Sequence, residues 1–303
     1  MTPPAISLYS ATDPSPINGT RTLLMGPPGS GKTTALRSWF ELEKKFGLPP
    51  GTLKMRVVAL DPNVWPILGS TPAAITHLRT SVGWKGLKDM AKSLHSLNNE
   101  QLQKETGWIT GNHEFVDLVN RMTNFVDTAG NKHGCCDTWG TDTLLVIDGL
   151  SGLSDLVAQA GCGHKLAWTQ PDWQKTMSSV GQFLKQITRG CFCHIIVVAH
   201  VEYETDVFQV PKIMASTLGR KLAPTIGKDF TDVVYVSMKG GVFSWSTANP
   251  SAELKAMHLP FKDNLEPTLE AILTTPEKGW LARGGVFSPV VPAVWSEPDY
   301  YKS

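Results

Sequence analysis

The chain has 303 residues, of which 41% are hydrophobic, 9% aromatic and 18% charged. This apolar fraction excludes a disordered protein, and no run of residues approaches the roughly 20 consecutive apolar positions of a membrane helix. The 28 basic and 27 acidic residues nearly cancel, which excludes a histone-like polycation but leaves room for a local basic surface. Five scattered cysteines do not form a disulfide framework. We therefore expect a cytoplasmic globular protein with no membrane partner.

Short continuous apolar runs alternate with segments of helical spacing along most of the chain. The runs predict buried strands at 23–25, 57–60, 144–147, 195–199 and 233–236. Helices are expected directly after residue 33 and at 86–103, 112–127 and 173–189. This alternation predicts a three-layer α/β fold with a mostly parallel central sheet, and a hairpin at 233–246. We expect a leader or linker at 1–20, a core at 21–275 and a C-terminal tail at 276–303.

A glycine-rich loop lies between the first predicted strand and the first predicted helix. It reads Gly26-Pro27-Pro28-Gly29-Ser30-Gly31-Lys32-Thr33, which matches the phosphate-binding pattern of P-loop NTPases. Backbone N–H groups of such a loop surround a phosphate, and the helix N-terminus adds its dipole. Lys32 is predicted to reach the β and γ phosphates, and the Thr33 hydroxyl to bind Mg²⁺. The predicted ATP-binding residues are Gly26, Gly29, Ser30, Gly31, Lys32, Thr33 and Thr34.

A second acidic position completes the predicted magnesium site. Asp148 directly follows four apolar residues of a predicted strand, so we expect it to bind Mg²⁺ together with Thr33. The next residue is Gly149, which excludes a carboxylate base at that position.

The general base must therefore come from another strand end. Asp61 follows the run at 57–60, and Glu202 follows the strand at 195–199; of the two, Asp61 is favoured. His200 stands at the carboxyl end of that later strand, where open α/β sheets bind their ligands. We interpret His200 as a sensor of the γ phosphate. The predicted catalytic residues are Lys32, Asp61, Asp148, His200 and Glu202.

With these residues in place, the chain resembles a RecA-type ATPase core over about residues 21–275. The segments that carry the resemblance are Ala59-Leu60-Asp61-Pro62, the strand and small residues from Leu144 to Leu153, and Val198-Ala199-His200. When the segments 211–213 and 218–224 are considered together with these motifs, the chain is similar to phage-encoded RecA-core ATPases of recombination and single-strand annealing. The resemblance implies a homo-oligomeric ring or filament with ATP at the subunit interface. Lys239, Lys255 and Lys262 fall where that family supplies a cation in trans.

In RecA-type proteins, two loops bind single-stranded DNA, and their positions here are about 150–172 and 202–221. The stretch from 207 to 228 holds four basic residues and no acidic one, as phosphate binding requires. The predicted nucleic-acid contacts are Phe208, Lys212, Arg220, Lys221 and Lys228, with Phe208 as a base-stacking residue. Trp168 and Trp173 lie in or near the first loop.

These observations predict a Mg²⁺-dependent, DNA-stimulated ATPase of recombination or strand annealing, with a single-strand-binding protein as a further partner. A translocating motor of helicase type is one alternative. A nucleotide-gated scaffold that binds no DNA is another. Every cysteine lies close to a histidine, but a zinc site would require three separate segments to converge, so packing is favoured for these cysteines.

Overall fold

A computed structural model describes residues 17–61, 67, 73–78, 88, 114–162, 168–205, 211–218 and 222–292. Within these residues an eight-stranded sheet has the order β10-β8-β1-β5-β4-β2-β3, with β9 paired to β8, and β6 and β7 form a separate two-stranded sheet. The strands are β1 (Arg21–Met25), β2 (Lys54–Ala59), β3 (Ala74–His77), β4 (Thr143–Asp148), β5 (His194–Ala199), β6 (Val201–Thr205), β7 (Pro211–Ala215), β8 (Asp232–Lys239), β9 (Val242–Ser246) and β10 (Lys255–Ala256). The α-helices are α1 (Lys32–Ala35), α2 (Ser38–Phe46), α5 (Glu114–Thr123), α6 (Leu150–Cys162), α7 (Gln170–Gly190), α8 (Ala223–Ile226) and α9 (Leu269–Thr274).

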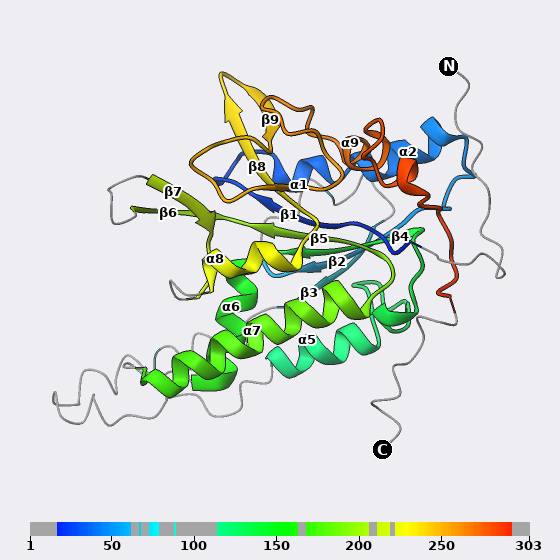
Figure 1. Cartoon of the computed structure of the whole chain (residues 1–303). Helices are drawn as coiled ribbons and strands as arrows, with labels where there is room; N and C mark the ends of the chain where they lie inside the picture. The colour runs from blue at the N-terminus through cyan, green and yellow to red at the C-terminus, as the bar shows by residue number, and fades with distance from the viewer. Residues whose placement is uncertain are drawn as a thin grey trace, which may run out of the picture.

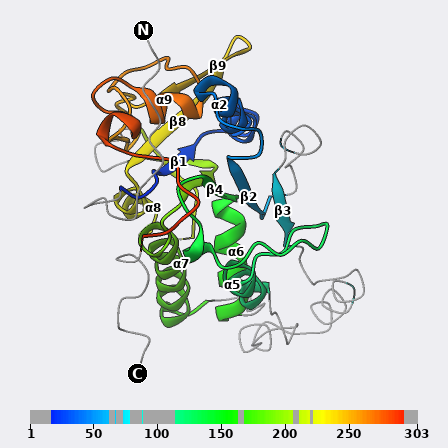
Figure 2. The same ribbon diagram turned by 90° about the vertical axis from the view of Figure 1, so that its right-hand side faces the viewer.

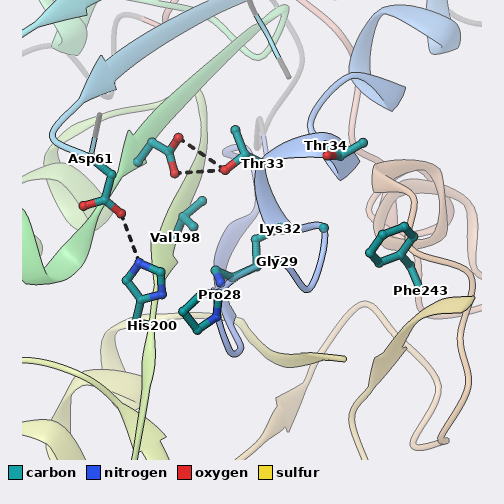
Figure 3. A pocket seen from close by; sticks show the side chains of 11 residues that line it. Pro28, Gly29, Lys32, Thr33, Thr34, Asp61, Val198, His200 and Phe243 are labelled. Carbon is teal, nitrogen blue, oxygen red and sulfur yellow. Dashed lines mark hydrogen bonds and ion pairs between the residues drawn. The ribbon is translucent and has the colours of Figure 1, made fainter. Parts of the chain in front are cut away.

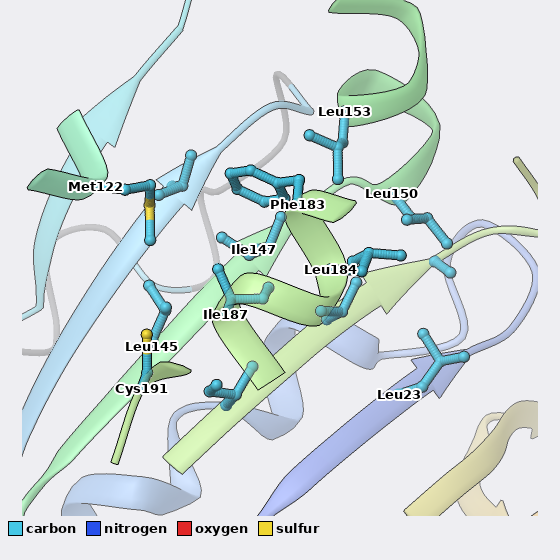
Figure 4. Close-up of a cluster of buried hydrophobic side chains, with 14 of the residues drawn as sticks. Leu23, Met122, Leu145, Ile147, Leu150, Leu153, Phe183, Leu184, Ile187 and Cys191 are labelled. Atoms are coloured by element: carbon cyan, nitrogen blue, oxygen red, sulfur yellow. The ribbon is translucent and has the colours of Figure 1, made fainter. Parts of the chain in front are cut away.

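Helices cover both faces of the sheet, which gives the predicted three-layer α/β fold (Figures 1 and 2). All pairs from β8 through β1, β5, β4 and β2 to β3 are parallel. On one face, β4 contributes Leu145 and Ile147, which pack with Phe183 and Leu184 of α7 (Figure 4). The alternate residues of the strands enter a second core under α1, α2 and α9. Because both faces are buried, these strands are apolar throughout, as their sequence runs predicted.

The predicted strands and the C-terminal hairpin are confirmed. β8 and β9 pair antiparallel around Gly240 and Gly241, both with positive φ, as a two-residue hairpin turn requires. α5 and α7 correspond to the predicted helices at 112–127 and 173–189. The helix predicted at 86–103 lies outside the described residues, apart from residue 88.

The two loops assigned to DNA binding are partly regular structure, so their prediction as loops was wrong over those parts. Residues 150–162 form α6, whose Leu150, Leu153 and Val157 are buried against the sheet. Gly152 disfavours a helix by propensity, but here a Cβ would lie 3.0 Å from the Cβ of Leu60, so close packing explains the glycine. Residues 201–205 and 211–215 form the β6–β7 hairpin.

The segment after residue 275 packs into the core over its described part. Trp280 and Phe287 are buried in the cluster under α2, and the Trp280 indole donates a hydrogen bond to the Asn18 carbonyl at 2.8 Å. The expected tail therefore closes one face of the sheet as far as residue 292, while the division into domains stays a prediction. Within the described part of the chain, no helix is both long and apolar enough to cross a membrane.

Candidate nucleotide site

The glycine-rich loop runs from the end of β1 into α1 and holds Lys32 inside the protein. The Lys32 ammonium donates hydrogen bonds to the carbonyls of Gly26 (2.8 Å) and Pro27 (2.9 Å), and the residue is only 6% exposed. Gly31 has φ 88°, a left-handed conformation that glycine adopts readily. The Ser30 hydroxyl oxygen is buried without a hydrogen-bond partner in the described structure. The loop thus holds a cation and an unsatisfied hydroxyl at the entrance of a helix, a suitable surface for phosphate.

Asp148 ends β4 opposite the first turn of α1. The Thr33 hydroxyl lies 3.4 Å from each of its carboxylate oxygens (Figure 3). Burial, together with the negative charge of Asp61, raises the pKa of Asp148 to about 7. Burial lowers the pKa of Lys32 to about 8, against the opposing effects of Asp148 and Asp61. The Asp148 carboxylate and the Thr33 hydroxyl offer the hard oxygen ligands that Mg²⁺ prefers, and a divalent cation would balance the negative charge of Asp148 and Asp61.

Asp61 and His200 approach the site from the strands on either side of β4. Their order follows from the sheet, because β4 lies between β2, which precedes Asp61, and β5, which precedes His200. The backbone N–H of Asp61 donates to the Asp148 carbonyl at 3.0 Å, which holds the residues directly after β2 against the end of β4. The His200 Nε2 lies 3.4 Å from the Asp61 carboxylate, and its Nδ1 is buried without a hydrogen-bond partner among described residues. A carboxylate and an imidazole therefore adjoin the magnesium ligands.

Gly149 is the residue that makes room for Asp61. It has φ 122°, and a Cβ added there would lie 2.7 Å from the Asp61 carboxylate oxygen and 3.0 Å from its backbone nitrogen. A side chain at residue 149 would therefore collide with Asp61, so the position after Asp148 is a glycine where the carboxylate of Asp61 packs.

We expect Gly149→Ala to slow ATP hydrolysis while leaving ATP binding largely intact. The new methyl group displaces the Asp61 carboxylate, and the strained backbone lowers the free energy of unfolding by about 1–3 kcal/mol. Steady-state hydrolysis, ATP titration and chemical denaturation measure the three effects. Gly181→Ala is the matched control, since a Cβ there meets nothing within 4 Å. Hydrolysis at the native rate in Gly149→Ala contradicts the positioning of Asp61.

These residues surround one pocket of about 440 Å³. It is lined by Pro28, Gly29, Gly31, Lys32, Thr33, Thr34, Asp61, Asp148, Val198, His200 and Phe243. Gly26 and Ser30 lie in the loop behind this lining, and the Gly26 N–H donates to the Ala199 carbonyl at 3.2 Å. The structure therefore brings together the predicted loop, both predicted magnesium ligands, Asp61 and His200.

Other predicted residues lie away from the pocket or outside the description. Glu202 is half-buried on β6, where burial and the nearby Glu204 raise its pKa, and it is not among the residues lining the pocket. Lys239, Lys255 and Lys262 are all exposed, and Lys255 donates a hydrogen bond to the Phe230 carbonyl. Of the predicted DNA contacts, Lys212 is exposed on β7 and Lys228 is exposed on the short 3-10 helix Gly227–Asp229. Phe208, Arg220 and Lys221 lie outside the described residues.

Sequence reasoning missed Phe243 and Val198 as pocket residues. Phe243 follows the β8–β9 turn, and its ring packs on Gly31, where a Cβ would lie 2.8 Å from the ring. No local pattern marks this residue, because the contact joins β9 to a loop more than 200 positions earlier. Val198 is part of the predicted strand, and its place beside Asp148 follows from the β4–β5 register.

Two of the cysteines lie beside an aspartate in one short segment. The ligand atoms of Cys135, Cys136 and Asp137 lie within 4.8 Å of one another. However, the hydrogen bond with Cys136, together with burial, raises the pKa of the Cys135 thiol. Among the described residues this group supplies three ligand atoms, one fewer than a structural zinc site takes, so these side chains fit the packing interpretation better.

Comparison with known proteins agrees with this geometry. The family model described as an AAA domain matches residues 18–257, which is well over half of the chain. The chain belongs to the AAA-domain family. It is a P-loop ATPase: the matched span of this AAA-domain protein contains the glycine-rich loop, Asp61, Asp148 and His200.

Two solved structures show a weak likeness to this AAA-domain protein. One is the flagellar accessory protein FlaH from Methanocaldococcus jannaschii, with 12% identity, a TM-score of 0.30, and coverage of 76% of this chain and 77% of that one. The other is EssC (ATPases 2 and 3) from Geobacillus thermodenitrificans, with 12% identity, a TM-score of 0.29, and coverage of 78% and 40%. Scores this low carry no functional argument. No curated protein matches the chain.

Proposed function

We propose that this ATPase is a homo-oligomeric, Mg²⁺-dependent protein that binds single-stranded DNA in homologous recombination or strand annealing. Its ATP state controls its affinity for DNA, and single strands stimulate hydrolysis. A phage origin and cooperation with a single-strand-binding protein belong to the same proposal. The observation that carries it is the direct connection between the nucleotide pocket and the β6–β7 hairpin.

In the proposed reaction each pocket residue has one task. Lys32 holds the β and γ phosphates, and Thr33 and Asp148 hold Mg²⁺, which neutralises charge on the phosphates when bound. Asp61 takes a proton from the attacking water. His200 faces the γ phosphate, with Asp61 accepting a hydrogen bond from its ring. This assignment uses five side chains that the fold already places around one pocket.

His200 joins this pocket to the hairpin. It lines the pocket and is followed at once by β6, while the Ser216 N–H at the far end of β7 donates to the His200 carbonyl at 2.7 Å. Both ends of the hairpin are therefore anchored at one pocket residue, and the hairpin extends beyond the main sheet (Figure 1). A movement of His200 with the γ phosphate would be transmitted to both strands.

The hairpin and the segment after it supply cationic and aromatic groups for DNA. Lys212 is exposed on β7, and Tyr203 on β6 is 63% exposed. Between 207 and 228 the chain has four basic residues and no acidic one. Glu204 lies opposite Lys212 in the strand register and offsets part of its charge. Cations and exposed rings together are the groups that hold a single strand.

Self-association is supported by the β8–β9 hairpin beside the pocket. Val242 is 68% exposed and Met238 is 47% exposed at its tip, next to the exposed Lys239. Unburied apolar side chains of this size are typical of contact surfaces. A second subunit packed there would bring one of its lysines close to the nucleotide of its neighbour. In the proposal this lysine is Lys239, Lys255 or Lys262.

Opposite substitutions on the two hairpin strands test DNA binding. We expect Lys212→Ala to weaken binding of a fluorescent oligonucleotide and to reduce its salt dependence, because one phosphate contact is lost. Glu204→Gln is expected to strengthen binding, since it removes the opposing charge. Fluorescence anisotropy over a salt series, with ATP present, measures both. Lys44→Ala on the surface of α2 is the control. An oligonucleotide affinity that neither hairpin variant changes contradicts the hairpin as the DNA surface.

A further inference from the structure

The nucleotide pocket has chemically different ends. Asp61 and His200 lie at one end, and Phe243 lies at the other, beyond Lys32 and Thr34 (Figure 3). The charged end suits the terminal phosphate and its metal, as described above. The aromatic end has no part in that chemistry, yet Phe243 is 43% exposed within the pocket wall.

A second recess continues from the aromatic end. It measures about 400 Å³ and shares Gly31, Thr34 and Phe243 with the phosphate pocket. Its remaining lining comes from α1, from α2 with the preceding Arg37, and from Pro267 and Thr268, which precede α9; Glu41 is one of the α2 residues. The two recesses therefore adjoin at these three residues, one toward Asp61 and the other toward α2.

The position of Phe243 is fixed by its contact with the phosphate loop. Its ring lies against Gly31, where a Cβ would come within 2.8 Å of it. The β8–β9 pairing, in which Phe243 opposes Met238, holds the strand that carries it. The ring is thus an apolar surface directly beside the phosphate loop, with part of its area unburied.

We propose that Phe243 stacks on the base of the bound nucleotide, and that the recess beyond Thr34 holds the base and sugar. The base is the apolar, planar end of a nucleoside triphosphate, and it must lie at the end of the pocket away from Asp61 when the γ phosphate faces Asp61. Pro267 and Thr268 form the wall at the other side of the recess, and the exposed Glu41 and Arg37 offer an acceptor and donors to the base edge. This inference rests on the proposed binding of ATP at the loop, and it identifies the residues that contact the base and sugar.

Comparison of ATP with inorganic tripolyphosphate separates base contacts from phosphate contacts. By isothermal titration calorimetry with Mg²⁺, we expect Phe243→Ala to weaken ATP binding about tenfold, the usual worth of one base–aromatic stack. Tripolyphosphate binding should stay unchanged in the same variant, which also shows that the loop remains folded. Phe243→Tyr should retain the native ATP affinity. Phe261→Ala is the matched control, because Phe261 is 76% exposed and lines neither recess.

The other outcomes overturn the proposal in distinguishable ways. An equal loss for ATP and tripolyphosphate assigns Phe243 a packing role on Gly31 alone. Unchanged ATP affinity in Phe243→Ala shows that the base lies elsewhere. If the native protein binds neither ligand, the nucleotide site itself fails, and with it the function proposed above.

Discussion

The Lys32→Ala variant is expected to lose ATP hydrolysis, with a fall of at least about 100-fold in the rate. Lys32 is the cation at the centre of the pocket, held by the Gly26 and Pro27 carbonyls at the entrance of α1. Its ammonium must exchange those carbonyls for phosphate oxygens when ATP binds, so the alanine variant loses affinity as well as rate. ATP titration and steady-state phosphate release measure the two effects.

Lys45→Ala is a suitable control for that experiment. Lys45 is a lysine of α2 whose ammonium pairs with Glu270 at the surface, and it lines neither recess. We expect this variant to hydrolyse ATP at the native rate. Native turnover in Lys32→Ala would refute the assignment of the glycine-rich loop as the phosphate site.

Asp61→Asn is expected to separate hydrolysis from binding. An amide cannot accept the proton of the attacking water, so the rate should fall by a factor on the order of 100 or more. Asn keeps the shape that fits against Gly149, and loss of a negative charge near the γ phosphate does not oppose ATP. The variant should therefore bind ATP at least as tightly as the native protein. Single-turnover hydrolysis combined with calorimetric titration checks both statements.

Glu202→Gln distinguishes the two carboxylates that the sequence offered as bases. Glu202 lies on β6 and is not among the residues lining the pocket, whereas Asp61 lines it beside His200. Removal of the Glu202 charge should leave the single-turnover rate unchanged in the absence of DNA. A large loss in Glu202→Gln together with a native rate in Asp61→Asn would reverse the assignment.

Much of the pocket followed from the positions of polar residues after apolar runs. In a parallel sheet the carboxyl ends of the strands share one edge, so Asp148 and His200 were expected at the same side as the glycine-rich loop. The structure adds the strand order, which places the ends of β2 and β5 on either side of β4. The sequence left both Asp61 and Glu202 as candidates for the general base. The strand order places Asp61 in the pocket, because β2 lies next to β4.

Features that depend on contacts between distant segments were not predictable from local patterns. The RecA-type resemblance placed a loop at about 150–172, but residues 150–162 form a helix. Burial of Leu150 and Leu153 against the sheet outweighs the weak helix propensity of Gly152 and Gly161. Phe243 enters the pocket because β9 folds over Gly31. Trp280 stands in a segment without periodicity, and its burial depends on contacts with residues far away in the chain, such as Asn18.

The most direct test of the central claim is the ATP hydrolysis rate of the purified protein with and without single-stranded DNA, measured beside Lys32→Ala. We expect Mg²⁺-dependent hydrolysis by the native protein that increases with single strands, and a rate at least about 100-fold lower for Lys32→Ala in either condition. Hydrolysis that DNA does not change would retain the nucleotide chemistry and contradict the coupling through His200 and the β6–β7 hairpin. Hydrolysis that persists in Lys32→Ala would contradict the nucleotide site itself.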